Sequence, residues 1–145
     1  MKRKKEKVKK TIAIILALLA MLSALTACGG QDIAPGETEL LWENATYKED
    51  AAIGEGAKTV TVSIEALEKK ITLTVSTNAE NLGEALYACS LINDPSFFDT
   101  ANGIKADYSE NQSWWAFYIG EEMAPYGVDS EIIENGNSYR LVYTR

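Results

Sequence analysis

The stretch KTVTVSIEALEKKITLTVST, residues 58–77, decides the fold because apolar and polar side chains alternate in both of its halves. Successive side chains of a β-strand point to opposite faces of a sheet, so each half predicts a strand with one buried face. The apolar positions are Val60, Val62 and Ile64, followed by Ile71, Leu73 and Val75. The five residues ALEKK between the halves fit a hairpin loop, so the stretch predicts an antiparallel hairpin.

A helix is predicted directly after this hairpin, in the segment NAENLGEALYACSLIND at residues 78–94. Its apolar stripe has the spacing i, i+3, i+4 and i+7 and consists of Leu82, Ala85, Leu86 and Cys89. Asn81 is a good N-cap, and a glutamate three residues later is typical of a helix start. Gly83 weakens a helix by roughly 1 kcal/mol relative to alanine, so we expect a close helix–sheet contact there. Cys89 is expected to be a small core residue.

Shorter strand signals follow Pro95. SFFDT is a candidate strand, ANGIKADY contains an Asn-Gly turn, and ENGN supplies another turn before SYRLVYT. WWAFYIG, residues 114–120, is the strongest strand signal in the chain. The order hairpin, helix, strands predicts an α+β fold: a β-grasp-like mixed sheet with one packed helix and with the last strand beside the first.

The first 28 residues have the three parts of a secretory signal. The basic run MKRKKEKVKK is followed by the apolar TIAIILALLAML and by small residues up to Cys28. LTAC, residues 25–28, resembles the lipobox of bacterial lipoproteins, in which the cysteine carries the lipid and the preceding peptide bond is cut. The resemblance implies a signal peptide at residues 1–27, lipidation of Cys28, and attachment to the outer face of the cytoplasmic membrane of a Gram-positive bacterium. An uncleaved transmembrane helix is the alternative, although residues 11–27 fall short of the roughly 20 that span a bilayer.

Residues 28–51 are typical of a flexible tether, because they mix glycine, proline and acidic residues with a single apolar cluster, Leu40-Leu41-Trp42. Within this segment Trp42 can dock onto the domain or onto another protein, or it can be an occasional apolar residue of a linker. The folded domain is then expected at residues 52–145.

Charge restricts the partners. The chain has 14 basic and 21 acidic side chains, and seven of the basic ones lie in the first ten residues beside a single acid. The remainder therefore holds seven basic and twenty acidic side chains, a net charge of −13. Such a surface repels phosphate backbones, which excludes nucleic acid as a partner. It also repels anionic lipid, so membrane attachment depends on the lipid anchor.

Nothing in the sequence predicts an enzyme. Histidine, the commonest general base and metal ligand, is absent. Cys89 has no base to activate its thiol. A start resembling a calcium loop at Asp107 fails at Gln112, where glycine is needed, and at Tyr118, where a bidentate glutamate belongs. We therefore expect no catalytic residue, no metal site and no cofactor.

Four blocks of the domain resemble the bacterial relatives of the transcobalamin C-terminal domain, a family long labelled as of unknown function. The blocks are GEGAKTVTVSIE, NLGEALYACSLI, NGIKADY and SWWAFYIGEEMAPYGVDSEIIENGNSYRLVYT, and they run in the family's order over residues 52–145. In transcobalamin and intrinsic factor this domain closes over one side of bound cobalamin with the loop after a tryptophan-bearing strand. The resemblance implies that Trp115 is that tryptophan and that Met123–Ser130 is that loop. Those carriers have a second, helical domain for which this chain has no room, so the resemblance implies a module that caps a ligand.

The adjacent tryptophans of WWAFYIG must face opposite sides of the sheet. One face consists of Trp115, Phe117 and Ile119, which we expect to pack against Leu86 of the helix; the other consists of Trp114, Ala116 and Tyr118. Tyr126 is expected beside Trp114, together with Tyr139 or Tyr143 of the last strand. This second face is either open, to hold flat rings, sugars or a partner surface, or covered by the loop 124–129 as a small core. The predicted ligand-binding residues are Trp114, Tyr118, Ala124, Pro125, Tyr126, Gly127 and Val128.

Two functions fit these features. The first is a lipid-anchored extracytoplasmic binding module for cobalamin or a related corrinoid in uptake, with an importer as partner. The alternative is a cell-surface domain that interacts with proteins or glycans and has no small-molecule ligand. An enzyme ranks last, because no activated nucleophile, general base or metal site is identifiable.

Overall fold

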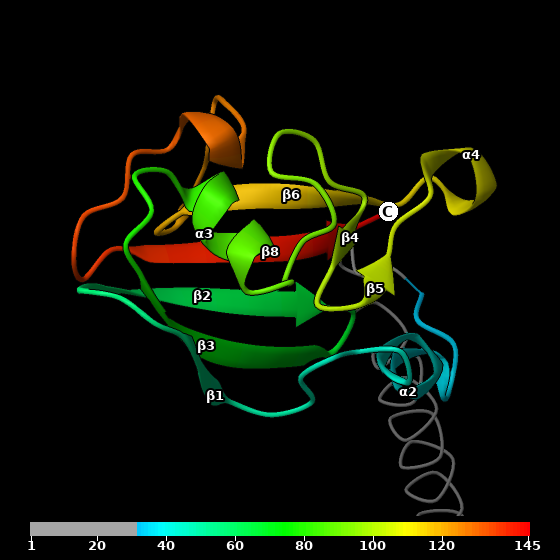
Figure 1. Cartoon of the computed structure of the whole chain (residues 1–145). Helices are drawn as coiled ribbons and strands as arrows, with labels where there is room; N and C mark the ends of the chain where they lie inside the picture. The colour runs from blue at the N-terminus through cyan, green and yellow to red at the C-terminus, as the bar shows by residue number, and fades with distance from the viewer. Residues whose placement is uncertain (1–31) are drawn as a thin grey trace, which may run out of the picture. The chain divides into compact units, whose positions relative to one another are not determined.

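The hairpin predicted at residues 58–77 is present within a six-stranded mixed sheet. In the computed structural model, which describes residues 32–145, strand β2 (Lys58–Ala66) pairs antiparallel with β3 (Lys69–Thr77). The register sets Val62 opposite Leu73, so the apolar side chains of both strands share one buried face. The strand order of the sheet is β1-β3-β2-β8-β6-β7 (Figure 1).

The remaining elements are short. The other strands of the sheet are β1 (Ala51–Gly54), β6 (Trp114–Ile119), β7 (Glu122–Met123) and β8 (Ser138–Thr144). A separate ribbon consists of β4 (Thr100–Ala101) and β5 (Ile104–Lys105). The helices are α2 (Glu37–Trp42), α3 (Leu82–Ala88), α4 (Tyr108–Asn111) and the single 3-10 turn η2 (Val128–Ser130). These elements confirm the predicted α+β class.

Strand β8 organises the sheet because it lies between the hairpin and the tryptophan-bearing strand. It runs parallel to β2 and antiparallel to β6, so the last strand lies beside the first strand of the hairpin, as predicted. Its inward side chains are buried, and they are Tyr139, Leu141 and Tyr143. Helix α3 and the loops around β4 and β5 cover this face of the sheet (Figure 1).

Helix α3 begins at the predicted N-cap. The Asn81 side chain accepts a hydrogen bond from the Glu84 N–H at 2.9 Å. Gly83 is required by a close approach, because a Cβ atom there would lie 2.2 Å from the carbonyl oxygen of Pro95. The close contact was predicted to be with the sheet, which is wrong: the backbone of the loop after α3 occupies that place.

The segment between α3 and β4 is a loop, so the strand predicted at SFFDT is wrong. The Asp94 carboxylate accepts hydrogen bonds from the N–H groups of Ser96 and Phe97 at 2.8 and 2.9 Å, which turns the chain. The predicted Asn-Gly turn is confirmed. Asn102 and Gly103 both have positive φ, 52° and 77°, and they join β4 to β5 in a tight hairpin.

Part of the predicted tether is folded. Trp42 of α2 is only 3% exposed, its indole N–H donates to the Ala66 carbonyl oxygen at 3.0 Å, and the Lys69 ammonium lies 4.7 Å from its ring centroid. The compact unit begins at Ile33, so a flexible tether over all of residues 28–51 is wrong for its larger, C-terminal part. Trp42 docks onto the domain itself.

The two ends of the compact unit are joined by an ion pair. The Arg145 guanidinium donates to the Glu37 carboxylate, with one N–O distance of 3.1 Å, and this bond lowers the pKa of Glu37. Among residues 32–145, no helix is long and apolar enough to cross a membrane. The signal peptide predicted at residues 1–27, and Cys28, lie outside the described residues.

Replacing Trp42 by alanine tests whether α2 belongs to the folded unit. We expect Trp42→Ala to lower the free energy of unfolding of residues 33–145 by about 3–5 kcal/mol, because it empties a buried aromatic site and removes a hydrogen bond. Leu40→Ala on the same helix is the control, since Leu40 is 65% exposed, and we expect a change within about 0.5 kcal/mol. Urea unfolding measures both. Equal free energies for the two variants would mean that α2 is an undocked linker.

Candidate ligand-binding groove

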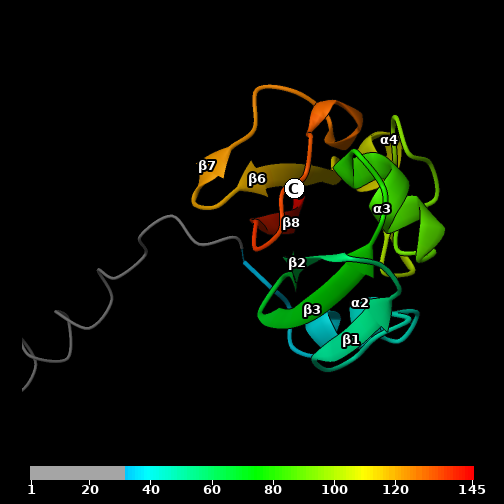
Figure 2. The same cartoon turned by 60° about the vertical axis from the view of Figure 1, so that its left-hand side comes forward.

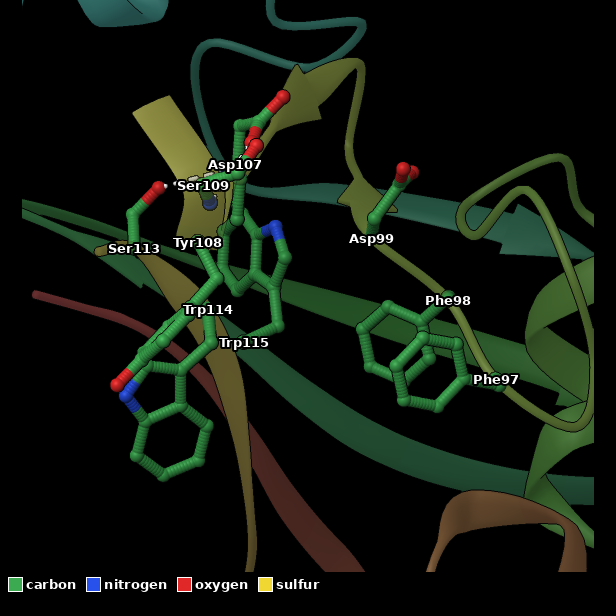
Figure 3. A pocket seen from close by; sticks show the side chains of 10 residues that line it. Phe97, Phe98, Asp99, Asp107, Tyr108, Ser109, Ser113, Trp114 and Trp115 are labelled. Atoms are coloured by element: carbon green, nitrogen blue, oxygen red, sulfur yellow. Dashed lines mark hydrogen bonds between the residues drawn. The ribbon is translucent and has the colours of Figure 1, made fainter. Parts of the chain in front are cut away.

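A groove follows the outer edge of β6, between this strand and the loop at residues 96–99. It consists of two adjoining hollows of about 370 and 220 Å³, and four residues line both: Phe97, Phe98, Trp114 and Trp115. Figure 3 shows the first hollow, with the two phenylalanine rings facing the strand from across it. The second hollow is also lined by Met123 of β7 and by residues of the loop that follows it. Figure 2 shows how β7 and this loop lie relative to β6. We call the two hollows together the β6 groove.

The rim of the β6 groove is the main exposed apolar surface of the described chain. Eight large apolar side chains are strongly exposed among residues 32–145, and five of these line the groove. The five are Phe97, Tyr108, Trp114, Met123 and Tyr126. Phe97 is the extreme case at 86% exposure, which costs hydrophobic free energy unless something covers the ring. A concentration of this kind marks a binding surface.

The predicted division between the two tryptophans is confirmed. Trp115 is 8% exposed, its indole N–H donates to the Ile104 carbonyl oxygen at 3.1 Å, and its ring meets the Tyr143 ring edge-on at 5.7 Å. Trp114 is 41% exposed, and the two indoles point in different directions (Figure 3). The alternative in which the loop 124–129 seals Trp114 in a small core therefore does not describe this structure.

Two tyrosines predicted beside Trp114 lie on the other face. The register pairs Trp115 with Tyr143 and Ile119 with Tyr139, and residues directly opposite each other share a face. Tyr139 and Tyr143 are therefore buried with Trp115, and the expectation that either flanks Trp114 is wrong.

Tyr118 has a structural partner instead of a place in the groove. The Arg140 guanidinium lies 4.9 Å from its ring centroid and also donates to both carboxylate oxygens of Glu65, at 2.8 and 3.0 Å. Those bonds lower the pKa of Glu65, so the pair stays ionised. Of the predicted ligand-binding residues, the groove brings together Trp114, Ala124, Tyr126, Gly127 and Val128, whereas Tyr118 and Pro125 are not in its lining. Their role in binding stays a prediction.

A buried carboxylate fixes the loop that carries Tyr126. Glu131 is buried and accepts hydrogen bonds from the hydroxyl groups of Tyr126 at 2.8 Å and Tyr139 at 2.9 Å. Asn137 donates to the Tyr139 hydroxyl at 2.8 Å. Each member of this chain has a partner, so the arrangement positions the loop without leaving a buried acid unsatisfied.

Sequence reasoning missed three contributors to the site. Glu131 gave no signal because an acid between two turns is usually solvated. Phe97 and Phe98 were assigned to a candidate strand, whereas they form the opposite wall of the groove. The turn-forming sequence Asp94-Pro95-Ser96 directly before this aromatic pair was the signal that could have placed it on an exposed loop.

The free cysteine of the described residues lies outside the groove. Cys89, which forms the C-cap of α3, is half-buried, and burial raises the pKa of its thiol, so it is not an activated nucleophile. No group of three or more acidic, cysteine or histidine side chains able to hold a metal occurs in the part of the chain that the structure describes.

Comparison with known proteins supports the fold. No family model and no curated protein matches the chain. A solved protein from Ruminococcus gnavus ATCC 29149, described provisionally as metal binding, has a TM-score of 0.57 and 25% identity over 61% of this chain and 98% of its own. Haptocorrin in complex with Cbi has a TM-score of 0.46 and 16% identity over 61% of this chain, which spans only 25% of haptocorrin.

Alkaline titration tests the buried carboxylate network. Burial is the main cause that raises the pKa of Tyr139 to about 12. The neutral phenol therefore contributes stability that is complete below its unfolded pKa of about 10 and is lost as pH rises through about 12. We expect the free energy of unfolding to fall across this window in the wild type and to show a smaller slope in Tyr139→Phe. Equal slopes in the two proteins would contradict the network.

Proposed function

We propose that this protein is a lipid-anchored extracytoplasmic binding module, and that its β6 groove holds one side of a large flat ring ligand of the corrinoid class. The observation that carries the proposal is the gathering of exposed aromatic side chains around a hollow with few charges. Aromatic faces bind flat, partly apolar rings, and polar tips such as the Tyr126 hydroxyl orient them.

The size of the groove fits a capping role. Its hollows, of about 370 and 220 Å³, are too small to enclose a corrin ring with its side chains. Pockets that enclose a drug-sized ligand reach about 300–1,000 Å³ and bury most of its surface. The groove therefore supports contact with one face or edge of the ring, and a second protein or the importer supplies the rest of the enclosure.

The corrinoid class is supported by the sequence blocks that resemble the transcobalamin C-terminal domain. The provisional metal-binding description of the Ruminococcus gnavus protein raises the separate question of a metal site. Residues 32–145 hold no candidate metal cluster, and a corrinoid carries its own cobalt, so the two facts are compatible. Cys28 would hold the domain at the membrane, and the acidic domain makes nucleic acid an unsuitable partner.

Fluorescence titration with corrinoids tests the ring ligand. Corrinoids absorb visible light, so binding beside Trp114 is expected to quench the tryptophan fluorescence of residues 33–145 in a saturable way. Trp114→Ala and Tyr126→Ala should weaken binding by about tenfold or more, because each removes an aromatic contact. Tyr87→Ala is the matched control: Tyr87 is 53% exposed and lies on α3, outside the groove.

Cobinamide and cobalamin are the probes. A parallel titration of free tryptophan measures the inner-filter effect, which is a non-saturable loss of fluorescence, and the protein data are corrected for it. No saturable quenching at high micromolar corrinoid would reject the ring ligand. Equal weakening in Tyr87→Ala would place the ligand outside the β6 groove.

Mutation of Cys28 tests the anchor. We expect the wild-type chain in the membrane fraction of a bacterial host. The Cys28→Ser variant should stay unprocessed and unlipidated, because the Cys28 sulfur is the atom that would carry the lipid. Metabolic labelling with a fatty-acid analogue and the mass of the mature chain measure this. Labelling that persists in Cys28→Ser would reject Cys28 as the lipidation site.

The alternative, a protein-interaction domain without a small-molecule ligand, is favoured by one specific observation. Phe97 projects from the loop at 86% exposure, and such a ring is the usual form of an anchor for a partner surface. Pull-down with residues 33–145 from the envelope of the source bacterium, compared between wild type and Phe97→Ala, distinguishes it from the corrinoid proposal.

A further inference from the structure

Strand β6 is a sheet edge over half of its length. β7 pairs with it only at Tyr118 and Ile119. One more bond follows, from the Ala124 N–H to the Phe117 carbonyl oxygen at 2.9 Å. The next residue is Pro125, which has no N–H to donate, and the chain then leaves the strand (Figure 2). The backbone from Trp114 to Ala116 is thus paired with β8 alone, and Phe117 has only its carbonyl oxygen bonded on the other side.

The direction of the backbone groups follows from two hydrogen bonds. The Gly120 N–H donates to the Ser138 carbonyl oxygen of β8, so residues at even positions of β6 direct their backbone groups to β8. Residues at odd positions direct theirs to the opposite edge, in agreement with the Ala124–Phe117 bond. Within residues 32–145, the Trp115 N–H and C=O and the Phe117 N–H have no hydrogen-bond partner. These groups border the β6 groove.

We propose that this edge binds an extended peptide segment of a partner protein, which adds a strand to β6 and inserts apolar side chains into the hollows. Strand addition uses main-chain hydrogen bonds for affinity and pockets at alternate side chains for selection. The free backbone groups of Trp115 and Phe117 supply the main-chain hydrogen bonds. The two hollows between β6 and the Phe97–Phe98 wall supply the pockets for side chains.

Charge fixes the chemistry of the peptide. The charged residues that line the groove are Asp99 and Asp107, both acidic. The Ser109 hydroxyl is the main cause that lowers the pKa of Asp107, so its carboxylate is ionised at neutral pH. Lys105 approaches Asp107 at 3.7 Å but is largely exposed, and residues 11–145 as a whole have a net charge of −13. The peptide is therefore one in which apolar residues alternate with lysine or arginine.

This inference does not rest on the corrinoid proposal, because main-chain pairing needs no ring ligand. The two occupants share the Phe97 wall and differ in the groups they need. A ring ligand needs the aromatic faces, whereas a peptide also needs the Trp115 and Phe117 N–H groups. Blocking the hydrogen-bonding groups of the ligand separates the two.

The probe is a capped hexapeptide of alternating valine and lysine, titrated into residues 33–145 by calorimetry and followed by amide hydrogen exchange. We expect the Trp115 amide to exchange rapidly in the free protein and at least about tenfold more slowly with the peptide. The Ala116 amide, which points to β8, is the internal control and should be slow in both states.

Two altered peptides and two protein variants complete the test. The same peptide with N-methyl groups on the strand-facing amides should not bind, and a valine–glutamate peptide should bind at least about tenfold more weakly. Phe97→Ala should weaken binding by about tenfold, and Tyr87→Ala should leave it unchanged. Undiminished binding of the N-methylated peptide, a slow Trp115 amide in the free monomer, or a dimer in sedimentation that protects this amide would each overturn the proposal.

Discussion

The pairing of β6 with β8 is the constraint on which the rest of the structure depends. Because the side chains of a strand alternate, the register that buries Trp115 against Tyr143 also places Trp114 outside. The hydrogen bond from the Trp115 indole to Ile104 reinforces this choice, since a slip by one residue would leave a buried N–H without its partner. The groove, its aromatic rim and its open strand edge all follow from that register.

The docking of α2 changes what the N-terminal segment can do. With Trp42 buried and Glu37 paired to Arg145, the compact unit begins at Ile33. If Cys28 carries the lipid, the few residues between it and Ile33 span at most about 17 Å, compared with the 25–30 Å reach of a fully flexible 24-residue tether. Under the lipid-anchor proposal, the domain would therefore lie close to the membrane and within reach of membrane-embedded partners.

The predictable features of this fold were local. Each of them depends on a few consecutive residues, and the structure has all of them. They are the alternation in β2, β3 and β6, the Asn81 cap and the Asn102–Gly103 turn. The features that sequence reasoning missed depend on partners far along the chain. The Trp42 indole hydrogen-bonds to Ala66, and Glu131 hydrogen-bonds to Tyr126 and Tyr139. The Phe97–Phe98 loop faces β6 only once the sheet has formed. Tyr139 and Tyr143 were assigned to the wrong face of the sheet, because the register between β8 and β6 decides which β8 side chains share a face with Trp114.

The exposure of the three indole N–H groups tests most directly whether the β6 groove is open. Trp42 and Trp115 donate to backbone carbonyl oxygens, whereas Trp114 has no such bond among the described residues and is 41% exposed. In a ¹H–¹⁵N spectrum of residues 33–145, we expect the Trp114 indole to exchange rapidly with water and the other two to be protected. A Trp114 indole as protected as that of Trp115 would mean that the chain closes its own groove, and it would contradict the account.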